Sequence, residues 1–220
     1  MKWLILIIGA YLLGSVPFGL LIARLHGIDL RRVGSGNIGA TNVVRALGRK
    51  WGTFCFLLDV CKGLVPMLIP PHLGLTQSPP SPLQLFGWLA VGTAAILGHI
   101  FPIYLKFKGG KGVATSLGVV LGLWPYLTIC GLAALLIWLL AAFLWRYVSL
   151  ASILAAAAFP LLLLAAIALR HDWTFQTLWP LFLVALPMPA LVIWRHRANI
   201  QRIRAGTESR IGRKKPKPSA

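Results

Sequence analysis

Charged residues are few in this sequence. They make up 12% of its 220 residues, where a soluble domain has about 25%. Hydrophobic residues make up 58%, which is more apolar surface than a soluble fold of this length can cover. Lipid must therefore be the solvent for most of the chain, and a soluble protein is excluded.

Acidic residues are the scarcest charged type, with four against 22 Lys and Arg. A net charge of +18 in a soluble protein would suggest a nucleic-acid partner. Here the basic residues lie between hydrophobic runs, which favours membrane topology and contact with anionic lipid instead. We expect membrane lipids as partners and no nucleic acid. The three cysteines lie in apolar runs without the spacing of a zinc site or a disulfide framework.

Six apolar runs are long enough to be read as membrane spans. They cover residues 3–23, 51–70, 83–105, 112–145, 147–169 and 173–194. The run 112–145 is too long for one crossing and short for two, and Trp124-Pro125 near its middle marks a natural break. The first run follows Met1-Lys2 like a signal peptide, but it lacks a clear cleavage site, so we expect a retained helix.

The distribution of basic residues decides the number of spans. Splitting 112–145 at Pro125 places 19 of the 22 Lys and Arg residues on one side of the membrane, which the positive-inside rule assigns to the cytoplasm. The prediction is an all-α integral membrane protein with seven transmembrane helices, the N-terminus outside and the C-terminus cytoplasmic. We expect residues 1–212 to form a single domain and residues 213–220 to form a basic, disordered tail. The pair Gly118/Gly122 has the spacing of a close helix contact, although such pairs also arise by chance in Gly-rich chains.

Three segments on the predicted cytoplasmic side are not typical linkers. The first runs from Gly34 to Asn42 and is followed by Arg45. Its glycines permit turns with exposed N–H groups that bind anions, its neutral polar side chains add donors, and an Arg fork suits phosphate. A flexible connector is about as common for one Gly-rich loop, but the density of polar residues favours a site. The candidate residues are Gly34, Ser35, Gly36, Asn37, Thr41, Asn42 and Arg45.

The second segment begins at His99 and leads through glycines and lysines into the next helix. A helix N-terminus with free N–H groups favours an anion. Anchoring at the membrane interface accounts for Lys106 and Lys108, but not for the glycines. We therefore predict phosphate binding here, with candidate residues His99, Gly109, Gly110, Lys111, Gly112 and Thr115.

The third segment runs from His196 through Asn199 to Glu208. A stop-transfer tail accounts for its arginines but not for these three residues. Only Asp29 and Glu208 provide carboxylates on this side, so a metal pair or a carboxylate dyad is not expected. We expect no metal and no cofactor. Asp59 and Lys62, three residues apart in a span, can form an ion pair, which is structural more often than catalytic.

The three segments together closely resemble the bacterial acyl-phosphate-dependent glycerol-3-phosphate acyltransferase family of integral membrane enzymes. The matching stretches are GSGNIGATNVVRALG (34–48), GHIFPIYLKFKGGKGVATSLG (98–118) and HRANIQRIRAGTE (196–208). The resemblance implies transfer of a fatty acyl group from acyl phosphate to the 1-hydroxyl of sn-glycerol 3-phosphate. The products are lysophosphatidic acid and inorganic phosphate, in phospholipid biosynthesis.

The resemblance also implies roles for individual residues. Ser35, Arg45 and Lys111 act on the phosphates, the glycines around Lys111 hold the acyl phosphate, and His196 with Asn199 positions glycerol 3-phosphate. Glu208 is structural or orienting. The expected partners are acyl phosphate, glycerol 3-phosphate and membrane lipids, and the expected state is a monomer in the bacterial inner membrane with its active site facing the cytoplasm. The alternative is a transporter of phosphate esters or anions, which usually has internal repeats and binds near the bilayer midplane.

Overall fold

The computed structural model describes residues 1–212, so the predicted tail 213–220 lies outside the described residues. Within residues 1–212 the chain forms helices and turns, with no β-strand. The elements are α1 (Lys2–Ser15), α2 (Phe18–Leu25), α3 (Ala40–Leu47), α4 (Arg49–His72), α5 (Pro82–Ile100), η1 (Ile103–Leu105), α6 (Val113–Gly122), α7 (Tyr126–Trp145), α8 (Val148–Leu169), α9 (Phe175–Leu178), η2 (Trp179–Leu181), α10 (Phe182–Ala185), α11 (Pro187–Arg195) and α12 (Arg197–Arg204).

Six helical segments of the described chain are long and apolar enough to cross a membrane. They are Lys2–Leu25, Arg49–His72, Pro82–Leu105, Tyr126–Trp145, Val148–Leu169 and Phe175–Arg195. The predicted break is present, because α6 ends at Gly122 and α7 begins at Tyr126. However, α6 has ten residues, or about 15 Å of helix, which is half of a hydrocarbon core about 30 Å thick. The all-helical membrane fold is confirmed, while seven crossings and the orientation of the termini stay predictions.

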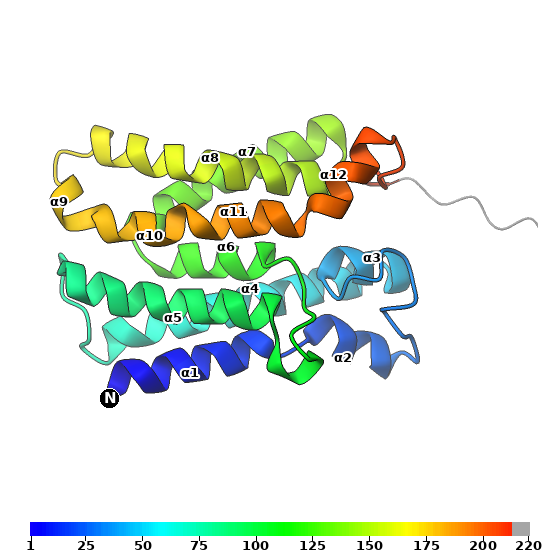
Figure 1. The fold of residues 1–220 in the computed structure, drawn as a ribbon, viewed down its shortest axis with the longest axis horizontal. Coiled ribbons are helices and arrows are strands. Elements are labelled where there is room, and N and C mark those ends of the chain that lie inside the picture. Colours follow the sequence, from blue (N-terminus) through cyan, green and yellow to red (C-terminus); the bar gives the residue numbers. More distant parts are fainter. Residues whose placement is uncertain (213–220) are drawn as a thin grey trace, which may run out of the picture.

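The short helix α6 lies between two layers of helices. In Figure 1 the elements α1–α5 lie on one side of it and α7–α12 on the other. It packs chiefly on α4, and also on α5 and α7. A Cβ atom built on Gly118 would lie 2.0 Å from the carbonyl oxygen of Val60 in α4. The predicted small-residue contact is therefore confirmed, and it joins α6 to α4.

A buried ion pair holds the broken first span against α4. Lys62 Nζ lies 3.0 Å from Asp59 Oδ1, so the predicted pairing is confirmed. The same ammonium donates a hydrogen bond of 2.9 Å to the carbonyl oxygen of Val16, where the chain leaves α1 ahead of α2. Because an unpaired backbone carbonyl is costly in lipid, Lys62 stabilises this break as well as neutralising Asp59.

The two ends of the bundle differ in charge. One end contains Met1 and the connections 73–81 and 170–174; the other, here called the basic end, contains α3, α12 and the connections 26–39, 106–112 and 146–147 (Figure 1). The elements and connections of the basic end, together with the last residue of α11 and the residues that follow α12, carry Arg31, Arg32, Arg45, Lys106, Lys108, Lys111, Arg146, Arg195, Arg197, Arg202, Arg204 and Arg210. The three unusual segments of the sequence all meet at this end.

Candidate active site

Asn42, on the first turn of α3, shapes the Gly-rich segment 34–42. Its Oδ1 accepts the N–H of Ser35 at 2.9 Å, and its Nδ2 donates to the carbonyl oxygens of Leu30 and Val33, both at 3.0 Å. A Cβ on Gly34 would lie 2.2 Å from that Oδ1, so only glycine fits there. Because both polar atoms of the Asn42 amide have partners inside the protein, this predicted binding residue holds the loop in place.

The remaining polar side chains of this segment are fully or partly accessible to solvent. Ser35 and Thr41 are exposed and Asn37 is partly buried. The Asn37 side chain accepts the N–H of Gly39 at 2.9 Å, and Gly36 has a φ of +68°. Arg45 passes close to Gly34: a Cβ on that glycine would lie 3.6 Å from the Arg45 Cδ.

Gly109 and Gly110 pack tightly where the second segment turns toward α6. Their N–H groups donate to the carbonyl oxygens of Ile100 and His99, at 3.1 and 3.0 Å. A Cβ on Gly109 would lie 2.2 Å from the His99 carbonyl oxygen, and one on Gly110 would lie 2.1 Å from the His99 Nε2. Both glycines are therefore needed for close packing, and their N–H groups are not free for an anion.

The free N–H groups begin one residue later. Within the described chain, the backbone N–H groups of residues 111–115 have no hydrogen-bond acceptor. Gly112 is the N-cap of α6, and the first helical bond there is donated by the Ser116 N–H to the Gly112 carbonyl oxygen. Thr115 is fully buried, and its hydroxyl has no partner among the described residues. This helix N-terminus therefore offers a row of donors suited to an anion.

His99 lies beneath this turn, inside the bundle. It is buried, and its Nδ1 is 3.7 Å from Asp59 Oδ1 without a hydrogen-bond partner among residues 1–212. Its carbonyl group and its ring both contact the Gly109–Gly110 turn. The predicted binding residue His99 thus packs against the Gly109–Gly110 turn on its buried side and holds it in place.

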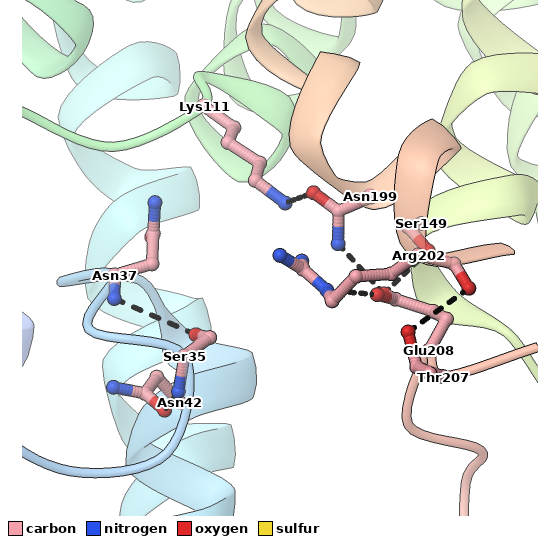
Figure 2. Close-up of polar contacts among 9 residues, drawn as sticks. All are labelled: Ser35, Asn37, Asn42, Lys111, Ser149, Asn199, Arg202, Thr207 and Glu208. Carbon is pink, nitrogen blue, oxygen red and sulfur yellow. Dashed lines mark hydrogen bonds and ion pairs between the residues drawn. The ribbon is translucent and has the colours of Figure 1, made fainter. Parts of the chain in front are cut away.

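Glu208 organises the third segment. Only 8% exposed, it accepts hydrogen bonds from Asn199 Nδ2 at 2.6 Å, Arg202 Nε at 2.7 Å and Ser149 Oγ at 2.8 Å. Asn199 in turn accepts a hydrogen bond from Lys111 Nζ (Figure 2). The Glu208 carboxylate thus fixes the orientation of the Asn199 amide, which accepts the hydrogen bond from Lys111.

The three segments face one another at the basic end. Figure 2 shows the loop that carries Ser35 and Asn37 on one side and Arg202 extending toward it from the other, while Lys111 points to Asn199. Within residues 1–212 no hydrogen bond joins the two sides. The loop with Ser35 belongs to the layer α1–α5, Arg202 belongs to the layer α7–α12, and Lys111 lies in the connection to α6 between them. The site is therefore formed only when the two layers pack together.

His196, at the start of the third segment, separates α11 from α12. His196 is 2% exposed, and its Nδ1 lies 2.8 Å from the carbonyl oxygen of Val192. Nδ1 must carry the proton in that contact, which leaves Nε2 as the acceptor. Burial, and then the charge of Lys111, lower the pKa of His196 to about 4. The ring is therefore neutral near pH 7.

Burial also lowers the pKa of Lys111, to about 8, opposed by attraction to Glu208 and reinforced by nearby arginines. Partial burial likewise lowers the pKa of Arg45, opposed by attraction to Glu208, although the two residues belong to different layers. For Glu208, burial favours the neutral acid, but hydrogen bonds from Asn199, Arg202 and Ser149 outweigh it and lower the pKa. The site therefore contains one carboxylate among several cations, and its charge suits an anionic ligand.

Three further residues of this site were not among the candidates predicted from the sequence. Ser149 lies at the start of α8, Arg202 resembles an ordinary basic-tail residue, and Arg195 differs from its basic neighbours only by preceding His196. Arg195 donates to the carbonyl oxygens of Gly109 and Gly110. No group of three His, Cys, Asp or Glu side chains in residues 1–212 is arranged to bind a metal ion.

The fold and the site define a multi-pass membrane protein with a polar, cationic site at one end of a helical bundle. The family model for glycerol-3-phosphate acyltransferase matches residues 4–206. Glycerol-3-phosphate acyltransferase from Geotalea daltonii is 49% identical over 207 residues, covering 94% of this chain and 96% of the relative. The Aquifex aeolicus protein of that name is 46% identical over 218 residues, covering 96% and 100%.

Two solved structures have the same fold. Both are of PlsY (YgiH), an integral membrane glycerol 3-phosphate acyltransferase. The glycerol 3-phosphate form has a TM-score of 0.80 and 45% identity, and the lysophosphatidic acid form a TM-score of 0.78 and 43% identity; each comparison covers 96% of both chains. The chain belongs to the glycerol-3-phosphate acyltransferase family. The predicted family is thus confirmed, and an acyltransferase is favoured over a transporter.

Proposed function

We propose that this protein transfers a fatty acyl group from acyl phosphate to the 1-hydroxyl of sn-glycerol 3-phosphate, giving lysophosphatidic acid and inorganic phosphate. The observation that carries the proposal is the proximity of the free N–H groups at 111–115, the Lys111 ammonium and the Arg45 guanidinium at one site. A donor whose leaving group is phosphate suits a site with many anion-binding groups and a single carboxylate.

The reaction needs few protein groups. The 1-hydroxyl oxygen attacks the acyl carbonyl carbon and forms the new ester bond, while the bond from that carbon to the phosphate oxygen breaks. The hydroxyl proton passes either to the departing phosphate or to Nε2 of His196, which is neutral and unprotonated at that atom near pH 7. Cationic and N–H donors stabilise the charge that develops on the carbonyl oxygen and the phosphate.

The three segments divide the substrates between them in this proposal. Lys111 and the N–H groups at the start of α6 hold one phosphate group. Ser35 and Arg45 approach the substrate phosphates from the layer α1–α5. The buried pair His196 and Asn199 positions glycerol 3-phosphate. The two solved PlsY structures, described as glycerol 3-phosphate and lysophosphatidic acid forms, support a substrate and a product of this chemistry.

The assay uses purified protein with palmitoyl phosphate and glycerol 3-phosphate, without metal and without coenzyme A. We expect equal amounts of inorganic phosphate and lysophosphatidic acid, and no product when palmitoyl-coenzyme A is the sole donor. Folded protein that forms no product from palmitoyl phosphate would refute the proposed donor. A His196→Ala variant with an unchanged pH–rate profile and near-normal turnover would eliminate His196 as the base and leave the departing phosphate.

We further infer that the enzyme is a monomer in the bacterial inner membrane and acts in phospholipid synthesis. Its basic end faces the cytoplasm in this proposal. The asymmetry of Lys and Arg between the two ends supports this orientation. Single cysteines introduced by Arg31→Cys and Gln77→Cys in a cysteine-free background report the sidedness. In spheroplasts a membrane-impermeant maleimide should label only Gln77→Cys, and labelling of only Arg31→Cys would reverse the orientation.

A further inference from the structure

Arg195, the last residue of α11, reaches across the site to the Gly109–Gly110 turn. Its Nη2 donates to the carbonyl oxygen of Gly109 at 2.9 Å, and its Nε donates to that of Gly110 at 3.2 Å. The guanidinium also lies 5.9 Å from the centre of the Phe101 ring. One planar group thus binds two successive peptide carbonyls of a turn that lies about 85 residues earlier in the chain.

These two bonds fix the direction of the next N–H group. The carbonyl of Gly110 and the N–H of Lys111 belong to one planar trans peptide, so they point in opposite directions. With the Gly110 carbonyl bound to Arg195, the Lys111 N–H faces away from α11. The preceding peptide is held on both sides, because Arg195 binds the Gly109 carbonyl while the Gly110 N–H binds the His99 carbonyl oxygen.

The turn depends on the hydrogen bonds from Arg195 because its two glycines have no side chains that could fix its conformation. Two successive glycines have more backbone freedom than any other pair, and fixing them costs conformational entropy. The second link between these segments is the hydrogen bond from Lys111 to Asn199. A phosphate bound by Lys111 competes for that ammonium, whereas the bonds of Arg195 to backbone carbonyls are not disturbed.

We propose that Arg195 is a positioning residue that orients the N–H groups at the start of α6 toward a substrate phosphate. The inference rests on the proposed function, in which those groups bind the phosphate of acyl phosphate or of glycerol 3-phosphate. Arg195 acts through the backbone of Gly109 and Gly110. A planar fork can bind two carbonyls at once, and a lysine ammonium cannot reproduce that geometry.

The test compares Arg195→Gln and Arg195→Lys with the control Arg197→Gln. Arg197 is exposed, lies two residues away and stacks on Trp194 at 4.4 Å, without a bond to the turn. KM and kcat are measured for palmitoyl phosphate and for glycerol 3-phosphate separately. We expect Arg195→Gln to raise one KM about tenfold or more, as for the loss of a charge-assisted hydrogen bond, with a smaller change in kcat.

Which KM rises identifies the substrate whose phosphate the turn binds. Arg195→Lys keeps the charge but has a single donor nitrogen in place of the planar fork, so its KM should lie between those of the wild type and Arg195→Gln. Arg197→Gln should leave both constants within about twofold, as expected for a surface substitution. The inference is overturned by unchanged KM values for both substrates in Arg195→Gln, or by an equal effect in Arg197→Gln.

Amide hydrogen exchange provides a test that does not depend on catalysis. In Arg195→Lys, which preserves more of the native contacts, peptides covering 106–112 should exchange faster while those of α4 are unchanged. Unchanged exchange at 106–112 contradicts the inference even if Arg195→Gln does not fold. Wild-type protein that is inactive with palmitoyl phosphate would instead refute the proposed donor. The exchange result would still show whether the hydrogen bonds of Arg195 hold the turn in place.

Discussion

Removing the Glu208 carboxylate should destabilise the protein and disorganise the site together. In Glu208→Ala, the buried donors Asn199 Nδ2 and Ser149 Oγ lose their acceptor. Each unpaired buried donor costs about 1–3 kcal/mol. The Arg202 side chain is 40% exposed, so its ion pair adds at most about 1 kcal/mol. The expected loss in free energy of unfolding is therefore about 2–7 kcal/mol.

Thermal unfolding in detergent, combined with the phosphate-release assay, measures both effects. On the scale of soluble domains of this size, a loss of 2 kcal/mol or more lowers the midpoint by at least about 4 °C. Turnover should fall as well, because Asn199 then no longer has a fixed orientation toward Lys111. Glu208→Gln is the matched control, since it keeps one acceptor oxygen and should retain more stability than Glu208→Ala. A midpoint for Glu208→Ala within 1 °C of the wild type would refute the reasoning.

The same carboxylate contributes to the pH dependence of stability. Its pKa in the folded protein lies below the usual value of 4.5. Its contribution is therefore fully present above about pH 4.5 and is lost as the pH falls through the lower folded value. Unfolding midpoints measured from pH 7 to pH 3 should fall more steeply for the wild type than for Glu208→Gln, and parallel curves would contradict this assignment.

Three further predictions concern other residues. Because the pKa of Lys111 is lowered to about 8, kcat/KM should fall as the pH rises through 8 in the wild type but not in Lys111→Arg, and a fall shared by both would exclude Lys111 as its source. Arg45→Ala should reduce kcat/KM by about 10- to 100-fold, corresponding to one charge-assisted hydrogen bond; normal kinetics would remove Arg45 from the site. A Cβ on Gly63 would lie 2.1 Å from the Thr115 carbonyl oxygen, whereas nothing lies within 4 Å of a Cβ on Gly9. Gly63→Ala should therefore cost about 1–3 kcal/mol of stability, and Gly9→Ala should cost close to none. Thermal unfolding of the two variants measures the difference.

Most of the membrane architecture could be predicted from the sequence, because lipid imposes simple requirements on composition. Apolar runs located the spanning segments, and Trp124-Pro125 located the break after α6. The small size of Gly118 predicted a close helix contact, and the three-residue spacing of Asp59 and Lys62 predicted their ion pair. Each of these features depends on neighbours in sequence or on a single residue type.

The partners inside the site could not be predicted in the same way. Ser149 bonds to Glu208 across 59 residues, and Arg195 bonds to Gly109 across 86. Such contacts follow from the packing of α8 and α11 against the rest of the fold, and no local pattern records them. The glycines illustrate the limit: Gly110 was expected to offer its N–H to phosphate, whereas in the structure that N–H is bound to the His99 carbonyl oxygen.

The concentration of cations at one end of the bundle has a kinetic consequence. A cluster of like charges beside a low-dielectric membrane raises the local concentration of oppositely charged solutes and accelerates their capture. At an ionic strength of 0.15 M the Debye length is about 8 Å, so added salt screens the exposed arginines more than the buried Lys111. The same field retains anionic products. In the proposed reaction, the surface that speeds the arrival of a phosphate ester therefore slows the departure of phosphate, and ionic strength shifts the balance between the two rates.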